Sequence, residues 1–353
     1  MKKIKYIVNY IKIKRKDLNL KKKIKSLLKG NETINYNYKK EISSYWNSYN
    51  IKHNIQWHKW YTSINGIADK KYIPENIFYC YIEPYYNNIS FDKAYSDKAI
   101  LKKIFPNIKQ PNTVVINVAG IFYDDNYNII SNEKAIELCS RHKDIIIKPT
   151  IESGGGKDIE FINLNKISCL NDNLNKIFLK FNKNFIVQEV ISQHEKLKCI
   201  NPESVNTVRV MSYLRGEDVY ILSSVLRMGI NGNRVDNSAF GGISCGISHR
   251  GYLKKYAYDK HGKKFTEHPQ GFIFDNKEVP YYDRIIELIK KEHKKIAHFK
   301  LISWDFAIDK LGNPILLEYN LSGQEINFHQ LNNGPLFGKL TENILNEVFN
   351  ENF

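Results

Sequence analysis

Residues 301–320 read LISWDFAIDKLGNPILLEYN, in which two apolar segments flank the turn-forming DKLGNP. Such a pattern predicts a β-hairpin. If Asp309 and Pro314 close the loop, antiparallel pairing places Asp305 opposite Glu318. Paired residues project from the same face of a sheet, so we predict that these two carboxylates lie side by side.

An amide oxygen joins the two carboxylates. Asn320 lies two residues beyond Glu318, and a strand returns to the same face at every second residue. Three oxygen donors on an apolar hairpin would repel one another without a cation between them, and hard oxygen ligands suit Mg²⁺ bound with substrate phosphates. The sequence therefore predicts a metal site of Asp305, Glu318 and Asn320. The alternative from these residues alone is an exposed hairpin face with ordinary polar side chains.

Length and composition favour a globular protein of the cytoplasm. The 353 residues are enough for two or three packed lobes, and 42% of them are hydrophobic. Five scattered cysteines, odd in number and without metal-type spacing, indicate reduced thiols in a cytosol. No stretch approaches the roughly 20 apolar residues of a membrane span, and no signal peptide is recognisable.

Net charge and the amino-terminal region leave two interpretations open. A charge of +16 favours contact with a nucleotide, a nucleic acid or an anionic membrane face, but a composition rich in Lys, Asn, Ile and Tyr gives the same charge without a partner. Residues 1–30 hold eleven lysines and Arg15 against the single acid Asp17. We favour a solvated helix packed on the body by one face over an amphipathic segment lying on an anionic membrane.

A lysine and a glycine-rich loop follow one another between two strands. Lys148 ends the apolar strand 144–149, and the strand 159–162 comes after the loop. The loop is formed by Ser153, Gly154, Gly155, Gly156 and Lys157. Bare glycine amides approach an anion closely, so the loop could cover nucleotide phosphates while the two lysines add charge. A plain hairpin turn would use the same residues, and the spacing fits neither the P-loop nor the dinucleotide fingerprint.

The next strands add a hinge and two arginines. An apolar strand runs into an extended linker at Gln188, Glu189, Val190 and Ile191. Its backbone could bind an adenine edge and the carboxylate of Glu189 a ribose, although an edge strand would look identical. Arg209 and Arg227 lie in two later strands and suit bidentate contact with phosphate or carboxylate, the alternative being two surface arginines.

Together these features resemble an ATP-grasp enzyme. Further motifs resemble the sugar-transfer-associated ATP-grasp family, which is found with bacterial cell-surface polysaccharide synthesis. They are Asn206-Thr207-Val208-Arg209, Arg227, Asp236-Asn237 with Gly241-Gly242, Trp304-Asp305 and Glu318-Tyr319-Asn320. The resemblance runs from about Phe91 to Leu340. It implies an α+β ATP-grasp fold with two α+β lobes that grip ATP, behind a mostly helical leader.

The resemblance also implies an organisation and roles for the site residues. The leader covers residues 1–90, the small lobe 91–187 and the large lobe with its hinge 188–353. Lys148 would contact the α or β phosphates under the glycine loop, and Glu189 with the backbone through Ile191 would bind adenosine. The predicted metal site would bind one or two Mg²⁺ between the β and γ phosphates. The two arginines would steady the γ phosphate and an acyl phosphate.

The implied activity is ATP-dependent ligation of a carboxylate to an amine through an acyl phosphate, in capsule or O-antigen synthesis. Its partners would be small-molecule or glycan acids and amines, without nucleic acid. The expected location is cytoplasmic, with peripheral contact of residues 1–30 at the inner membrane face as the open variant. Two rivals are a kinase acting on a glycan or small-molecule hydroxyl and a charge-driven protein that binds nucleic acid or a membrane surface.

Overall fold

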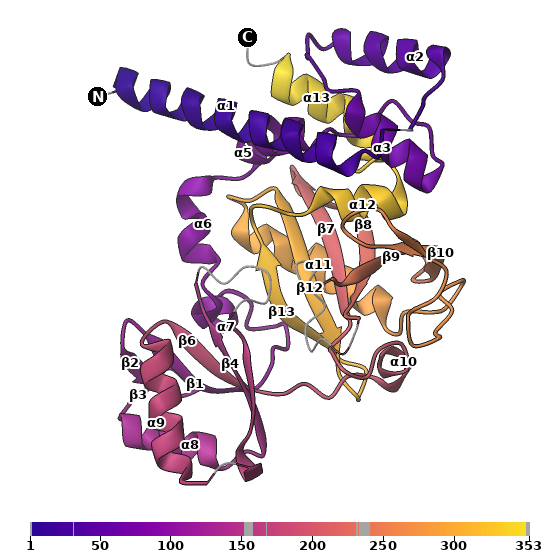
Figure 1. Ribbon diagram of the computed structural model, residues 1–353. Coiled ribbons are helices and arrows are strands. Elements are labelled where there is room, and N and C mark those ends of the chain that lie inside the picture. The colour runs from indigo at the N-terminus through magenta and orange to yellow at the C-terminus, as the bar shows by residue number, and fades with distance from the viewer. Residues whose placement is uncertain are drawn as a thin grey trace.

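The computed structural model describes residues 2–30, 32–151, 158–166, 168–230, 232 and 241–350. Figure 1 shows a helical layer that contains the amino-terminal region, a large sheet beneath it and a smaller sheet with two helices at the bottom. Both sheets carry helices, so the predicted α+β class with a mostly helical leader is confirmed. No helix within the described residues is long and apolar enough to cross a membrane.

The amino-terminal region shares a core with the large sheet. Its helices are α1 (Lys2–Leu27), α2 (Tyr36–Asn47), α3 (Gln56–Asn65), α4 (Glu75–Ile77), η1 (Phe78–Ile82), α5 (Glu83–Tyr86) and α6 (Ile89–Tyr95). Tyr38, Ile42 and Trp46 recur at helical spacing on α2 and are all buried. They belong to a core that also contains Met211 and Leu301 of the large sheet. The leader is therefore packed on the large lobe rather than tethered to it.

The smaller sheet has the strand order β3-β2-β1-β6-β4-β5. Its strands are β1 (Thr113–Val118), β2 (Ile121–Tyr123), β3 (Ile129–Ile130), β4 (Asp144–Pro149), β5 (Glu160–Asn163) and β6 (Phe185–Glu189). Helices α8 (Asn132–Ser140) and α9 (Leu170–Phe181) cover one face, where they pack on Ile145 and Ile147. Because side chains alternate along a strand, Ile146 and Lys148 project from the opposite face.

The larger sheet has the order β11-β10-β9-β8-β7-β12-β13. Its strands are β7 (Thr207–Arg215), β8 (Asp218–Met228), β9 (Ile243–Ile247), β10 (Leu253–Tyr258), β11 (Lys264–Phe265), β12 (Leu301–Ile308) and β13 (Pro314–Asn320). Trp304 and Phe306 pack in one core with Ile285 and Ile289 of α11 (Tyr282–Glu292). Asp305 lies between them in the strand and therefore faces away from α11.

Short helical segments complete the chain. They are η2 (Lys98–Ile100) and α7 (Leu101–Ile104) before β1, η4 (Leu164–Lys166) after β5, α10 (Glu195–Lys198) after the hinge and η6 (His293–Ile296) after α11. Near the end come α12 (Ile326–Asn333), η7 (Gly338–Leu340) and α13 (Thr341–Phe349). Helix α12 contacts strands β8 and β9, so it lies against the larger sheet.

The predicted hairpin is present, and Asp305 pairs with Glu318 as predicted. The end of the hairpin differs by one residue, because Pro314 pairs with Ile308 instead of Asp309. A register shift between Asp305 and Phe306 compensates, with Leu317 as the extra residue on β13. Such a bulge restores the pairing that brings the two carboxylates together.

Gly312 in the hairpin loop offers a test of how firmly this loop is packed. Its φ is +82°, and a Cβ added there would lie 2.3 Å from the Tyr281 ring. We expect Gly312→Ala to lower the free energy of unfolding by about 2 to 4 kcal/mol, which combines left-handed strain with overpacking. Gly216→Ala is the control, since Gly216 also has a positive φ, +58°, but open space around it. Urea unfolding measures both variants, and equal losses would contradict the packing contribution.

Candidate functional site

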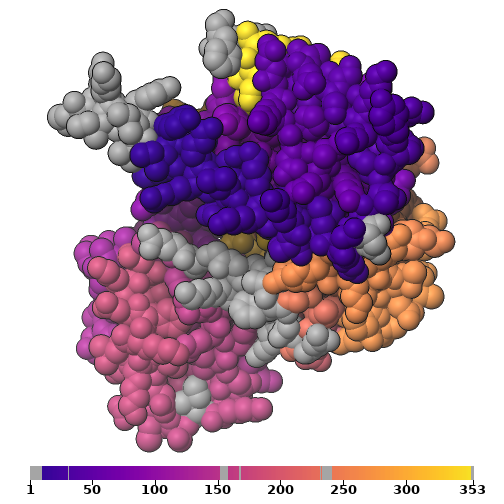
Figure 2. All heavy atoms as spheres, turned by 45° about the horizontal axis from the view of Figure 1, so that its top comes forward, coloured from indigo at the N-terminus to yellow at the C-terminus, as the bar shows by residue number. Residues whose placement is uncertain are grey.

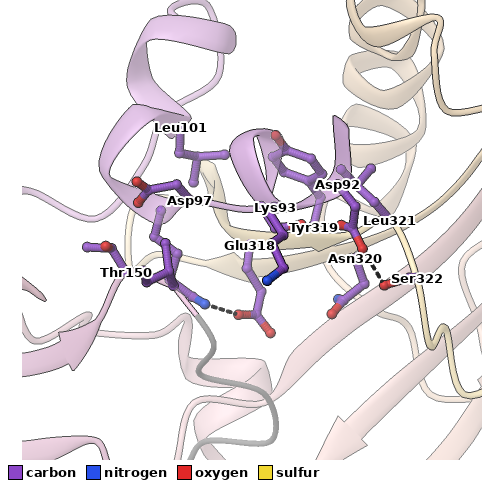
Figure 3. A pocket seen from close by; sticks show the side chains of 13 residues that line it. Asp92, Lys93, Asp97, Leu101, Thr150, Glu318, Tyr319, Asn320, Leu321 and Ser322 are labelled. Carbon is purple, nitrogen blue, oxygen red and sulfur yellow. Dashed lines mark hydrogen bonds and ion pairs between the residues drawn. The ribbon is translucent and has the colours of Figure 1, made fainter. Parts of the chain in front are cut away.

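A cavity of about 330 Å³ lies between the two sheets. Its walls come from segment 92–101, from Thr150 and Ile151 directly after β4, and from residues 318–322 at the end of β13. Figure 3 shows Glu318 and Asn320 projecting from the β13 wall into the space below segment 92–101. The carboxyl end of the predicted hairpin thus forms one wall of an interlobe cavity.

Glu318 is a cavity carboxylate that interacts with several cations. Its Oε2 atom lies 3.2 Å from Nζ of Lys98. Burial alone would raise the pKa of Glu318, but Lys98, Lys148 and Arg209 lower it to about 2, so the carboxylate stays ionised. Burial and the positive charge of Lys98 lower the pKa of Lys148 to about 8, although Glu318 opposes this shift. Two lysines beside one carboxylate leave a positive surplus that favours an anion such as a phosphate.

Asp305 is buried, with 2% of its surface exposed, and it forms an ion pair with Arg209. Nε of Arg209 donates to Oδ1 at 2.7 Å, and Nη2 donates to Oδ2 at 2.5 Å. Nη1 of Arg227 lies 3.4 Å from the same Oδ2. The third guanidinium nitrogen of Arg209 donates to Oε2 of Glu325 at 2.6 Å. Burial raises the pKa of Asp305, and the ion pair with Arg209 opposes the shift.

The three predicted metal ligands lie together. Asp305 and Glu318 are cross-strand partners, and Nδ2 of Asn320 is 3.5 Å from Oδ2 of Asp305. Two carboxylates with an amide fit the oxygen donors that Mg²⁺ prefers. Both oxygens of Asp305 already accept hydrogen bonds from Arg209, so a metal ion would share this carboxylate through its remaining lone pairs. Within the described residues no cluster of three or more His, Cys, Asp or Glu side chains is arranged for a metal.

The two predicted hinge side chains lie on opposite faces of the smaller sheet. Lys148 pairs with Ile186, and the register of β4 and β6 places Gln188 on the same face as Lys148. The amide nitrogen of Gln188 donates to Oγ1 of Thr113, and its Oε1 is buried without a hydrogen-bond partner.

Glu189 projects from the other face, so its side chain is directed away from Lys148. Its Oε2 accepts from Nδ2 of Asn112 at 2.7 Å, and its Oε1 lies 2.9 Å from Nδ1 of His142. A contact between this carboxylate and a ribose, as predicted from the sequence, would require these partners to be released. Val190 and Ile191 follow β6 as an extended linker.

Two groups of predicted residues lie outside the described residues. The glycine loop contributes Ser153, Gly154, Gly155, Gly156 and Lys157, and the second glycine-rich motif contributes Asp236 and Asn237. Their predicted roles stay predictions. Gly242, at the end of the second motif, is buried directly before β9.

Sequence reasoning missed Lys98, whereas it predicts that His329 is structural or exposed and lies in a tail that could cap the site. Lys98 is the first residue of η2, and its backbone amide donates to the carbonyl of Thr150. The side chain of Asp97 caps this turn by accepting from the Ala99 amide. Asp97 as a helix cap was the one available signal. His329 is buried on α12, with Nδ1 2.8 Å from Oγ of Ser223 and Nε2 without a partner. Burial lowers its pKa to about 3, and the positive charges of nearby arginines act in the same direction.

Comparison with known proteins adds the family. The profile of sugar-transfer associated ATP-grasp proteins matches residues 80–346, which is well over half of the chain. The chain belongs to the sugar-transfer associated ATP-grasp family. This match confirms the resemblance and the ATP-grasp fold that it implied. A search of curated proteins finds no match to this ATP-grasp chain.

Solved structures give weaker similarities to this ATP-grasp protein. The biotin carboxylase domain of Hydrogenobacter thermophilus 2-oxoglutarate carboxylase, in complex with ADP and magnesium, has 13% identity and a TM-score of 0.44, over 71% of this chain and 45% of that one. The ATP-grasp ligase PsnB with its minimal precursor has 12% identity and a TM-score of 0.42, over 74% and 63%. D-alanine–D-alanine ligase from Bacillus anthracis has 13% identity and a TM-score of 0.39, over 72% and 67%. The chain thus spans less than half of the carboxylase domain, and the family match alone carries the assignment.

The buried ion pair predicts unequal effects of two substitutions among the metal-ligand candidates. Asp305→Asn removes the buried carboxylate that Arg209 holds with two hydrogen bonds and that Arg227 approaches, while Arg209 keeps its contact with Glu325, so we expect a loss of about 3 kcal/mol in the free energy of unfolding. Asn320→Ala removes only one long hydrogen bond and should cost less than about 1 kcal/mol. Chemical denaturation of both variants measures the difference. Similar stabilities would show that the arginines do not depend on Asp305.

Proposed function

We propose that this protein is an ATP-dependent carboxylate–amine ligase that forms an amide through an acyl phosphate. The observation that carries the proposal is the position of Glu318. It lines an interlobe cavity, pairs across the hairpin with Asp305, forms an ion pair with Lys98 and is near enough to Lys148 for that charge to lower its pKa. Oxygen donors next to cations in one cleft suit a magnesium nucleotide, and membership of an ATP-grasp family supports the same ligand.

In this proposal the two lysines bind the phosphates of ATP. Lys148 projects from the smaller sheet and Lys98 from η2 in the cavity wall, so the triphosphate lies in the cavity between the lobes. Asp305, Glu318 and Asn320 would bind Mg²⁺, which neutralises the charge that shifts between the β and γ phosphates. The adenine would lie at the extended linker of Val190 and Ile191, whose backbone groups come directly after β6.

The chemistry proceeds in two balanced steps. A carboxylate oxygen of the first substrate attacks the γ phosphorus, the bond to the β-phosphate oxygen breaks, and ADP leaves. The nitrogen of the second substrate then attacks the acyl carbon, inorganic phosphate leaves, and the amine loses a proton. Arg209 and Arg227 lie beside Asp305 and would stabilise the negative charge on the transferred group. Positioning and charge, rather than a side-chain nucleophile, would carry catalysis.

The substrate class follows from the family description alone. We propose that the acid or the amine is carried by a sugar destined for a bacterial surface polysaccharide, a capsule or an O-antigen, because the family is described as associated with sugar transfer. Uronic acids, amino acids and amino sugars are the corresponding test compounds.

Trapping with hydroxylamine tests the ligase without knowledge of the amine. Purified protein with Mg-ATP, hydroxylamine and the correct acid should release ADP and equal inorganic phosphate, and the acid should appear as a hydroxamate. Glu318→Gln should lower this rate by about a hundredfold or more, because it removes a proposed metal ligand. Lys310→Glu, an exposed position in the hairpin loop, is the control and should retain the rate.

Two results would overturn the ligase. One is ADP formation with a stable phosphoester and no free phosphate, which indicates a kinase. The other is the absence of acid-dependent ADP release across the whole panel of acids.

The pKa of Lys148 predicts a pH dependence for ATP binding. Since burial lowers this pKa to about 8, the positive charge is present below pH 8 and is lost above it. We expect KM for ATP to rise above pH 8, by up to about tenfold for each pH unit. Lys148→Arg keeps its charge at all these pH values, so its KM should stay level over the same range. Parallel curves for the two proteins would exclude Lys148 as the titrating group.

A further inference from the structure

Most of the net charge of the protein lies on its first helix. Residues 1–30 contain eleven lysines and Arg15 against the single acid Asp17, so they carry eleven of the sixteen net positive charges. The remaining 323 residues carry only five. A drift in composition would spread lysine along the chain, and the concentration in one helix therefore needs another explanation.

One face of α1 is fixed to the body of the protein. Ile24 is fully buried in a core with Trp57 and Trp60 of α3. Nζ of Lys23 is 2.7 Å from Oε1 of Glu75, and Asp17 accepts from the side chain of Asn76. These contacts determine which side of the helix faces outwards.

The outward face combines cations with large apolar side chains. Ile11 is 45% exposed and Leu18 is 56% exposed, and their positions differ by seven, so they lie on one line along the helix. Arg15 follows Ile11 by four positions, and Lys22 follows Leu18 by four positions. Both basic side chains are exposed on the same face of the helix. Figure 1 shows α1 running along the outside of the helical layer, with its first turns extending beyond it. Figure 2 shows the indigo side chains of this segment at the surface.

We propose that the outer face of α1 binds an anionic membrane surface, with the helix axis in the plane of the membrane. Basic side chains on a helix are attracted to acidic headgroups, and exposed aliphatic side chains between them can enter the boundary with the acyl chains. Binding to a nucleic acid would need only the basic side chains, because its affinity comes mainly from contacts with phosphates. The exposed Ile11 and Leu18 would find no apolar environment on a phosphate backbone. The aliphatic line between the cations therefore favours a membrane as the partner. This inference is independent of the ligase proposal.

Vesicle co-sedimentation of the full chain tests the surface. We expect binding to vesicles of phosphatidylcholine with phosphatidylglycerol, much weaker binding to pure phosphatidylcholine, and a decrease as salt is added. Arg15→Glu with Lys22→Glu should weaken binding to the anionic vesicles by about 30-fold or more, since each basic residue near the surface contributes roughly fivefold. Ile11→Ser with Leu18→Ser should weaken the binding that persists at high salt.

The matched control is Lys260→Glu with Lys310→Glu, two exposed turn positions outside α1 with the same change in charge. This pair should leave vesicle binding within about twofold, because the electrostatic attraction decays within a Debye length. Circular dichroism of each variant checks that the fold is retained. Equal loss in the control pair, unchanged binding in the Ile11 and Leu18 pair, or binding to nucleic acid but not to anionic vesicles would each overturn the proposal.

Discussion

The buried ion pair between Arg209 and Asp305 is the constraint on which the site depends. It joins β7 to β12, next to the edge strand β13 of the larger sheet, and both side chains are almost fully enclosed. A buried pair adds little net stability, yet loss of one partner is costly because the other charge stays buried. The sheet register is thereby held in place, and Glu318, paired with Asp305 from the next strand, is directed into the cavity. The position of the Glu318 carboxylate in the cavity thus depends on the buried ion pair of Arg209 and Asp305.

The features that could be predicted from sequence were those that strand alternation determines. The pairing of Asp305 with Glu318 followed from the pattern of one hairpin, and it holds even though the loop closes one residue differently. The bulge at Leu317 could not be predicted, because contacts next to it come from a distant segment: the amide of Leu316 donates to the carbonyl of Lys109. The face of Glu189 depends on the register of β4 against β6, and local sequence does not specify pairing across forty residues.

Residues missed by the sequence analysis come from segments without a periodic pattern. Lys98 belongs to a three-residue helical turn, too short for hydrophobic periodicity to show. His329, which the sequence predicts to be structural or exposed, lies among buried polar side chains of α12. The leader gave no chemical motif, and its role in the structure comes from aromatic packing on the large lobe. Long-range packing of this kind is visible only once the chain is folded.

The contact between Asn112 and Glu189 has a mechanical consequence. The chain enters the smaller sheet just after Asn112 and leaves it just after Glu189, and these residues are joined both by a side-chain bond and by a backbone bond of 2.9 Å. The smaller sheet with α8 and α9 is thus closed at this contact, and it is also held by η2, where Ala99 packs against Ile116 and Ile186. A rotation there would carry Lys148 toward or away from Glu318 while the core under α8 and α9 turned as a unit. The bonds between Glu189 and Asn112 would then hold the first and last strand ends of the smaller sheet together during such a rotation.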